Sequence, residues 1–135
     1  MTLAAVRTAS PPALLLLNLG CGRDIKPGWE NVDLYGGEAV LKADIARFPW
    51  PWEDDSVKEV LLHNVLEHLP DTVGVMKEHY RVCANGALVH IAVPHPRHDD
   101  FISDPTHCSP ITQATMHLFS RKACEATAND ANNPL

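Results

Sequence analysis

The stretch Leu14-Leu-Leu-Leu-Asn-Leu-Gly-Cys-Gly-Arg23 decides the fold of this chain. Its apolar part predicts a buried strand over residues 13–19, which ends in a Gly-x-Gly loop. Glycines lack a Cβ atom, so such a loop can bring bare backbone close to a ligand. Asp33 follows Gly22 by eleven residues and ends a second short apolar run. A carboxylate there can accept hydrogen bonds from both hydroxyls of a ribose, so the pattern predicts a nucleoside-shaped ligand.

Further short strands alternate with crossovers along the chain. They are predicted over residues 30–34, 39–43, 57–62 and 87–93, with an irregular segment over 94–110 and a short helix over 111–119. This alternation predicts an α/β fold, a Rossmann-like and mostly parallel sheet of about five strands with helices on its faces. Ligands of such sheets bind at the carboxyl ends of the strands.

One helix is predicted before the fifth strand. Asp71 suits its N-cap, and Asn85-Gly86 suits its end because both residues tolerate positive φ. Glu78 and Arg81 lie three residues apart on it and are expected to form an ion pair, solvated or structural. Its apolar face is predicted from spacings of three and four residues to comprise Val73, Met76, Tyr80 and Cys83.

The length and charge of the chain bound its organisation and its partners. The 135 residues indicate one domain over 13–126, with a flexible arm over 1–12 and a frayed tail over 127–135. The formal net charge of -6 makes nucleic acid an unlikely partner, because phosphate binding favours a basic face.

The cysteines and the apolar runs indicate a compartment. The four cysteines form no C-x-x-C pair and are interpreted as free thiols in a reducing environment. Leu14 to Leu17 is too short a run for a signal peptide, and no segment approaches the ~20 apolar residues that span a bilayer. These features predict a cytoplasmic protein without a membrane partner.

The glycine loop does not match the loops that bind phosphates. The third glycine of a dinucleotide-binding motif is replaced by Ile25, and no Gly-Lys-Ser/Thr sequence is present. A ligand with a ribose but without a phosphate fits better.

At this point the chain resembles the class I S-adenosylmethionine-dependent methyltransferases. The resemblance runs from about Leu14 to Pro94 and covers a minimal, truncated form of that fold. Only ten residues separate Gly22 from Asp33, which resembles a subset with a shortened first crossover, and little chain follows Val93 for the usual last strands. The segments that carry the resemblance are residues 17–22, 31–33, 43–45, 54–60, 63–69 and 77–88.

The resemblance implies S-adenosyl-L-methionine as the cofactor. By that likeness Asp33 would hold the ribose diol, Asp44 would accept from the adenine amino group, and Ile45 would pack on the ring. The glycines, His63 and Asn64 would lie beside the methionyl part and the sulfonium. The implied cofactor-binding residues are Asn18, Gly20, Cys21, Gly22, Asp33, Leu34, Asp44, Ile45, His63 and Asn64.

Several of these features also have purely structural interpretations. Asp33 and Asp44 are common residue types in turns and at N-caps. Trp50 and Trp52 could stack on adenine or form a hydrophobic clamp on the sheet. Glu67-His68 could be an acid–base pair, although a role of Glu67 in ordering its loop is the preferred interpretation.

The segment from His95 to Cys108 carries three histidines and three aspartates. It follows the fifth strand, which would place it over the methyl group of the cofactor. A lid or substrate wall is the first interpretation, and a general base from His95, His98 or His107 is the second. A metal site is the third, and no metal ligands are assigned.

The sequence thus predicts an S-adenosylmethionine-dependent methyltransferase that acts on an unidentified small molecule or saccharide. The first alternative is a non-catalytic module that binds the cofactor or a partner on the same fold. The second is a metal-dependent protein that uses the segment His95–His107. An unfinished sheet edge would also suit a homodimer.

Overall fold

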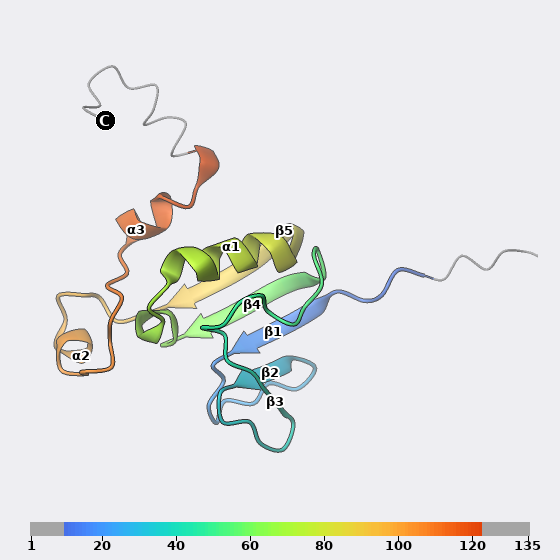
Figure 1. Ribbon diagram of the computed structural model, residues 1–135, viewed down its shortest axis with the longest axis horizontal. Coiled ribbons are helices and arrows are strands. Elements are labelled where there is room, and N and C mark those ends of the chain that lie inside the picture. The colour runs from blue at the N-terminus through green and yellow to red at the C-terminus, as the bar shows by residue number, and fades with distance from the viewer. Residues whose placement is uncertain (1–9, 123–135) are drawn as a thin grey trace, which may run out of the picture.

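The computed structural model describes residues 10–122, in which five strands form one sheet (Figure 1). The strands are β1 (Leu15–Leu19), β2 (Glu30–Asp33), β3 (Val40–Lys42), β4 (Val57–His63) and β5 (Cys83–Ala92). Their order is β3-β2-β1-β4-β5, and every neighbouring pair is parallel. The predicted α/β sheet of five strands is confirmed. The predicted tail over 127–135 and most of the predicted arm lie outside the described residues.

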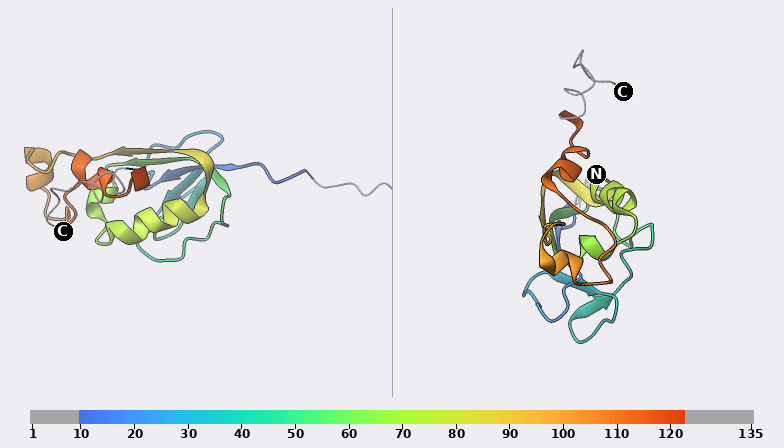
Figure 2. Two further views of the ribbon diagram at one scale, coloured as in Figure 1. Left: turned by 90° about the horizontal axis from the view of Figure 1, so that it is seen from above. Right: turned by 90° about the vertical axis from the view of Figure 1, so that its left-hand side faces the viewer.

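The strand order reverses between β1 and β4. The chain moves one way from β1 to β2 and the other way from β4 to β5. Right-handed crossovers then place the two connections on opposite faces of the sheet. Helix α1 (Thr72–Val82) covers one face between β4 and β5, while residues 20–29 connect β1 to β2 on the other (Figure 2). The carboxyl ends of β1, β2 and β4 meet at this reversal, where α/β sheets bind ligands.

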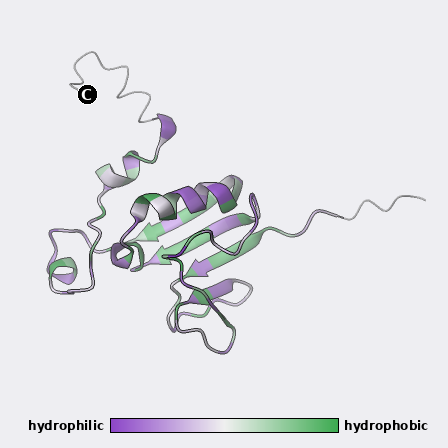
Figure 3. Ribbon diagram, viewed as in Figure 1, coloured by the Kyte–Doolittle hydropathy of each residue, from purple (hydrophilic) through white to green (hydrophobic). Residues whose placement is uncertain are grey.

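The core lies between the sheet and α1. Leu17, Leu19 and Val60 alternate with less buried residues along their strands and are fully or almost fully buried. Val75 and Val82 of α1 pack against the same cluster. The hydropathy colouring of Figure 3 shows apolar residues concentrated on β1 and β4 and a mixed surface on α1. This division is the period-two pattern expected of a sheet covered by an amphipathic helix.

The predicted apolar face of α1 is wrong. Val73 is 52% exposed and Tyr80 is 66% exposed, whereas the buried residues of the helix are Val75, Glu78, His79 and Val82. Two of the four inward residues are polar. Glu78 bonds to Arg81 and to the backbone N–H of Trp50, and Nδ1 of His79 bonds to the carbonyl of Val75 in the same helix. The apolar spacing therefore indicated the wrong side of the helix.

The predicted start of α1 is confirmed, and its predicted end is wrong. Asp71 is the N-cap, and its Oδ1 accepts a hydrogen bond of 2.8 Å from the backbone N–H of Gly74. The predicted stop at Asn85-Gly86 is wrong, because Cys83 is already extended and pairs with Val57. Asn85-Gly86 instead lies inside β5, where the register with β4 shifts and Gly86 has φ of 81°. A glycine allows that irregularity within the strand.

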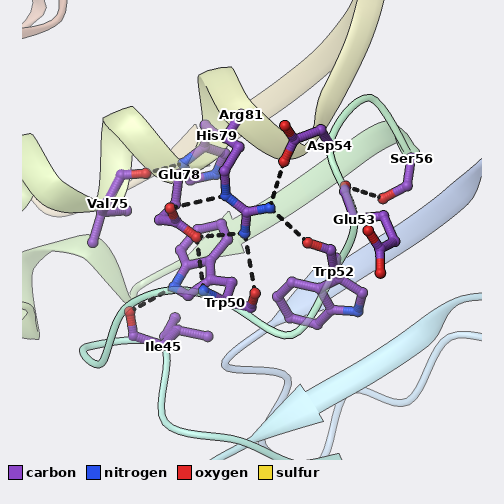
Figure 4. A network of polar contacts seen from close by, with 10 residues as sticks. All are labelled: Ile45, Trp50, Trp52, Glu53, Asp54, Ser56, Val75, Glu78, His79 and Arg81. Carbon is purple, nitrogen blue, oxygen red and sulfur yellow. Dashed lines mark hydrogen bonds and ion pairs between the residues drawn. The ribbon is translucent and has the colours of Figure 1, made fainter.

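The Glu78–Arg81 ion pair is structural and joins α1 to the loop between β3 and β4 (Figure 4). All five N–H groups of Arg81 donate, to both carboxylate oxygens of Glu78, to the carbonyls of Trp50 and Trp52, and to Asp54. Glu78 Oε2 also accepts 2.7 Å from the backbone N–H of Trp50. Hydrogen bonds to Arg81 lower the pKa of Glu78.

Trp50 and Trp52 form a hydrophobic clamp, which is one of the two roles that the sequence predicts for them. Trp50 is 3% exposed and Trp52 is 6% exposed, and their rings meet edge to face at 5.8 Å. Trp50 Nε1 donates 2.9 Å to the carbonyl of Ile45. Because both rings are buried in the core, neither offers a face to a ligand.

His79 is held as a neutral ring in this core. Its Nδ1 donates 2.9 Å to the carbonyl of Val75, and its ring meets that of Trp50 edge to face at 5.0 Å. Its Nε2 is buried and has no hydrogen-bond partner within residues 10–122. Burial therefore lowers the pKa of His79 below its ordinary value of 6.5, and the nearby Val75 carbonyl and Glu78 only partly oppose that effect.

We expect His79→Leu to flatten the pH dependence of stability in the mildly acidic range. The unfolded chain protonates His79 near pH 6.5 and the folded chain does so at lower pH. Below about pH 6.5 the unfolded state therefore binds more protons than the folded state. The stability of the wild type then decreases as the pH is lowered. Urea unfolding at pH 7.5 and pH 5.5, followed by tryptophan fluorescence, checks this. His117→Leu, at an exposed histidine, should keep the wild-type slope, and an equal slope in His79→Leu would contradict the account.

Two short helices follow β5. Helix α2 (Asp99–Ile102) lies in the segment predicted to be irregular, and its first turn is capped by His98, which accepts from the backbone N–H of Asp100. Helix α3 (Gln113–His117) lies inside the helix predicted over 111–119 and has a capping box between Thr112 and Thr115. None of the helices within residues 10–122 has the length and apolarity that crossing a bilayer requires.

Candidate functional site

The glycine loop turns sharply at the end of β1. Gly20 has φ of 63°, and a Cβ atom built on it would lie 2.4 Å from Cγ2 of Val65. Position 20 therefore needs glycine both for its backbone conformation and for the close approach of the β4–α1 connection. Gly22 has φ of 52° and open space around it, so its need is conformational.

Asp33 turns its carboxylate toward this loop. Its Oδ2 accepts 3.0 Å from the backbone N–H of Gly22, and its Oδ1 accepts 3.1 Å from that of Tyr35. These bonds fix the carboxylate at the carboxyl end of β2. Each carboxylate oxygen can accept a further hydrogen bond, so the group remains able to bind a hydroxyl.

Asp44 follows β3 and lies on the same side. Its Oδ1 accepts 3.0 Å from the backbone N–H of Ala46, and its Oδ2 pairs with Nε of Arg47 at 3.3 Å. The turn-capping interpretations of both aspartates are thus confirmed. The same bonds hold the two carboxylates beside one cavity, so capping and ligand binding do not exclude each other.

One cavity of about 510 Å³ joins the ends of these strands. Its walls come from β2, from the turn after β3 and from the β4–α1 connection. The lining residues are Gly20, Val32, Asp33, Leu34, Tyr35, Ala43, Asp44, Ile45, Asn64, Val65, His68 and Leu69. Six of the residues implied by the resemblance are among them: Gly20, Asp33, Leu34, Asp44, Ile45 and Asn64.

Four implied residues lie outside this lining. Asn18 is buried on the other face of the sheet, where its Nδ2 donates 2.9 Å to Asn31 Oδ1 and 2.7 Å to the carbonyl of Asp24. Cys21 is buried, and that burial raises the pKa of its thiol. Gly22 donates its N–H to Asp33, and His63 ends β4 in an exposed position.

Asn64 of the β4–α1 connection was predicted from the sequence, but three further residues of that connection were missed. Val65, His68 and Leu69 line it because Asn64 takes φ of 55° and η1 (Leu66–His68) follows at once. Asparagine is among the non-glycine residues that tolerate this conformation. In the sequence, the signal for such a turn is an asparagine, Asn64, close to the end of a predicted strand.

The charge of the cavity is acidic. Among residues 10–122, its lining includes the carboxylates of Asp33 and Asp44 and no lysine or arginine side chain. Carboxylates accept from hydroxyl and amino groups, and they repel phosphate. The apolar side chains of Val32, Ile45 and Leu69 offer flat packing surfaces beside them. The cavity therefore suits an uncharged or cationic nucleoside.

The three histidines of the predicted lid have different surroundings. His95 and His98 are exposed, and each ring accepts from a backbone N–H two residues ahead, on Arg97 and Asp100 respectively. The side chain of His107 is only 6% exposed, and its ring meets that of His68 edge to face at 4.6 Å. His107 is therefore the one of the three that reaches a residue of the cavity.

The comparisons with known proteins agree with this geometry. A family model described as "Methyltransferase domain" matches residues 23–91, which is more than half of the chain. This protein therefore belongs to the methyltransferase domain family. The match begins directly after Gly22 and includes Asp33, Asp44 and the β4–α1 connection. No curated protein matches the chain.

A solved structure shares the fold. It is the crystal structure of a SAM-dependent methyltransferase from Archaeoglobus fulgidus, with 20% sequence identity and a TM-score of 0.65. The similar region covers 82% of this chain and 60% of that chain. This chain thus spans less than two thirds of the length of that protein, and the likeness shows the fold.

Proposed function

We propose that the protein is an S-adenosylmethionine-dependent methyltransferase that acts on a small-molecule or saccharide acceptor. The observation that carries this proposal is one cavity in which Gly20, Asp33 and Asp44 converge at the strand reversal. Membership of the methyltransferase domain family supports methyl transfer. The likeness to a SAM-dependent methyltransferase from Archaeoglobus fulgidus supports the choice of S-adenosylmethionine.

The residues present fit an adenosyl group. The volume of about 510 Å³ lies in the range of about 300–1,000 Å³ that small-molecule sites occupy. Asp33 would hold the ribose hydroxyls, with its carboxylate already fixed by the backbone N–H groups of Gly22 and Tyr35. Asp44 would accept from the adenine amino group, and Ile45, which is 7% exposed, would pack on the ring.

The role of this chain in the reaction is to position two molecules and to exclude water. S-adenosylmethionine supplies an electrophilic methyl group when bound. The acidic lining stabilises a positively charged ligand, because Asp33 and Asp44 face the same cavity. The rigid glycine loop and the capped aspartates fix the site before binding, which reduces the entropy lost in aligning the reactants.

The choice of acceptor depends on the absence of basic side chains from the cavity lining within residues 10–122. The cavity lining over these residues therefore has no counter-charge for a phosphate backbone. His68 and Asn64 offer polar atoms beside the apolar wall. These features favour a neutral, hydroxyl-bearing acceptor. The free thiols of Cys21, Cys83 and Cys108 favour a reducing compartment such as the cytoplasm.

Isothermal titration tests the proposal. We expect S-adenosylmethionine and its demethylated product to bind at one site per chain, and adenosine triphosphate not to bind, because its phosphates meet two carboxylates. Folded protein that gives no heat with either adenosyl compound would overturn the proposal. A panel of hydroxyl-bearing acceptors with labelled S-adenosylmethionine then measures turnover, and binding without turnover would favour a non-catalytic module.

A further inference from the structure

A buried carboxyl group without a partner lies beside the cavity. Glu67 belongs to η1 and is 1% exposed, and both its Oε1 and its Oε2 are buried without a hydrogen-bond partner within residues 10–122. Such a group is costly because burial removes its hydration and nothing replaces it. The cost calls for a ligand that supplies positive charge or donors to these oxygens.

The unpartnered carboxylate faces two histidines. One ligand atom each from Glu67, His68 and His107 lies within 4.8 Å of the other two. Nε2 of His107 is 3.9 Å from Glu67 Oε1 and 3.5 Å from Asp104 Oδ2, and its side chain is only 6% exposed. These two separations are too long for good hydrogen bonds. They are close to the spacing of about 3.4 Å between two atoms that each lie about 2.1 Å from a tetrahedral ion.

The hydrogen bond of the His107 ring leaves its Nε2 atom available to a ligand. Its Nδ1 lies 2.9 Å from the backbone carbonyl of Phe101, and a carbonyl can only accept. Nδ1 therefore carries the proton, and the neutral ring has its lone pair on Nε2. That lone pair then faces carboxylate oxygens of Glu67 and Asp104, an arrangement that is repulsive unless a proton or a metal cation lies between them.

His68 is oriented in the same way by a side-chain relay. Thr106 Oγ1 donates 2.6 Å to Asp104 Oδ1, so it must accept from His68 Nδ1, which lies 3.0 Å away. The lone pair of the neutral His68 ring is therefore on Nε2. Hydrogen bonds from the far nitrogen of a ring to a carbonyl or a carboxylate relay are typical outer-shell supports of metal-binding histidines.

The backbone fixes the two halves of this cluster against each other. The N–H groups of Cys108 and Ser109 both donate to the carbonyl of Glu67, at 2.9 and 3.0 Å. Ser109 Oγ also donates 2.5 Å to the carbonyl of Leu69. The segment that carries His107 is thus bonded directly to η1, which carries Glu67 and His68.

We propose that Glu67, His68 and His107 form a binding site for one divalent transition-metal ion, with Zn²⁺ as the best match. Two imidazoles and one carboxylate suit Zn²⁺, whereas Mg²⁺ and Ca²⁺ prefer oxygen ligands alone. Asp104 lies 3.5 Å from His107 Nε2 and adds negative charge. The histidines 95 and 98 take no part, so this site differs from a metal site built on the His95–His107 segment alone.

The site lies next to the cavity through His68, which belongs to both. Three protein ligands leave a fourth position open in a tetrahedral site. If the proposed methyltransferase function is correct, that position can bind an oxygen atom of the acceptor. Metal binding itself stands on the geometry of Glu67, His68 and His107 and does not depend on that function.

Zinc titration of tag-free protein, after removal of metal with a chelator, tests the site. We expect one Zn²⁺ per chain, a rise in melting temperature on addition of Zn²⁺, and no displacement by excess Mg²⁺. Glu67→Gln keeps the shape of the side chain and should weaken Zn²⁺ binding by at least about 100-fold. His68→Ala changes an exposed residue and should weaken it similarly if Glu67→Gln fails to fold.

Two matched controls separate this site from adventitious binding. Cys108→Ser removes the exposed thiol next to His107, and His117→Ala removes an exposed histidine on α3. Both should bind Zn²⁺ like the wild type. Co²⁺ in place of Zn²⁺ should give the visible spectrum of a tetrahedral site without a thiolate charge-transfer band.

Several results would overturn the proposal. The first is folded wild-type protein that binds no Zn²⁺. The second is zinc affinity that Glu67→Gln leaves unchanged or that Cys108→Ser abolishes. Binding of S-adenosylhomocysteine by Glu67→Gln is measured alongside and should persist, because Glu67 does not line the cavity. Loss of zinc binding alone in Glu67→Gln thus tests this site. The proposed function is tested separately, by whether the wild type binds the adenosyl compound at all.

Discussion

Arg81→Met is expected to lower the free energy of unfolding by about 3 kcal/mol, because it leaves the carboxylate of Glu78 buried without its cation. The side chain of Glu78 is 12% exposed, and Arg81 donates to both of its oxygens. The carbonyls of Trp50 and Trp52 lose donors at the same time. Urea unfolding followed by tryptophan fluorescence measures the change, since Trp50 lies in this network.

A matched variant and a double variant test the cause. Arg97→Met removes an exposed arginine and should change stability by less than about 0.5 kcal/mol. Arg81→Met combined with Glu78→Met should cost less than the sum of the single changes, because no charge is then left buried. Strict additivity, or an Arg81→Met variant within about 1 kcal/mol of the wild type, would show that the pair does not hold α1 to the tryptophan loop.

Asp33→Ala is expected to weaken binding of S-adenosylhomocysteine about 100-fold, or roughly 2.8 kcal/mol. The reason is the loss of charge-assisted hydrogen bonding to the ribose, for which one such bond is worth about 1.5–3 kcal/mol. Isothermal titration measures the affinity. A 2′-deoxy analogue should bind the wild type more weakly than the parent compound, and Asp33→Ala should lose that preference.

The control for this prediction is Asp24→Ala, an aspartate near the glycine loop that does not line the cavity. Asp24 pairs with Lys26 at 3.1 Å, and its side chain is 66% exposed. It should bind S-adenosylhomocysteine like the wild type. If Asp33→Ala is folded and retains wild-type affinity, the cavity does not hold the ribose at Asp33, and the assignment of the adenosyl site fails.

The sequence was sufficient to predict the sheet. Short apolar runs bounded by glycine, proline and aspartate located all five strands, and β1, β3 and β4 deviate from their predicted bounds by at most two residues. The apolar spacing indicated the wrong face of α1, because periodicity counts apolar residues and cannot detect that Glu78 is buried in a network with Arg81 and the backbone of Trp50. Trp50 precedes Glu78 by 28 residues, so this contact becomes visible only in three dimensions.

Part of the candidate site could likewise be predicted from the sequence, and part could not. Asp33, Asp44 and Gly20 could be predicted because each stands at a strand end, and the ends of parallel strands meet. The role of His68 could not, because it depends on the positive φ of Asn64 and on the turn of η1. The environment of Glu67 depends on residues about forty positions later in the chain, which no local pattern records.

The brevity of the β1–β2 connection sets the order in which the site can assemble. The hydrogen bond from Gly22 to Asp33 closes a loop of about ten residues, and loops of that size close within about 10–100 ns. The wall formed by the β4–α1 connection instead requires the pairing of Leu17 with Val60, whose loop-closure entropy cost is greater by about 1 kcal/mol. The side of the cavity at Asp33 therefore depends on contacts that are local in the sequence, whereas the side at the β4–α1 connection depends on more distant ones.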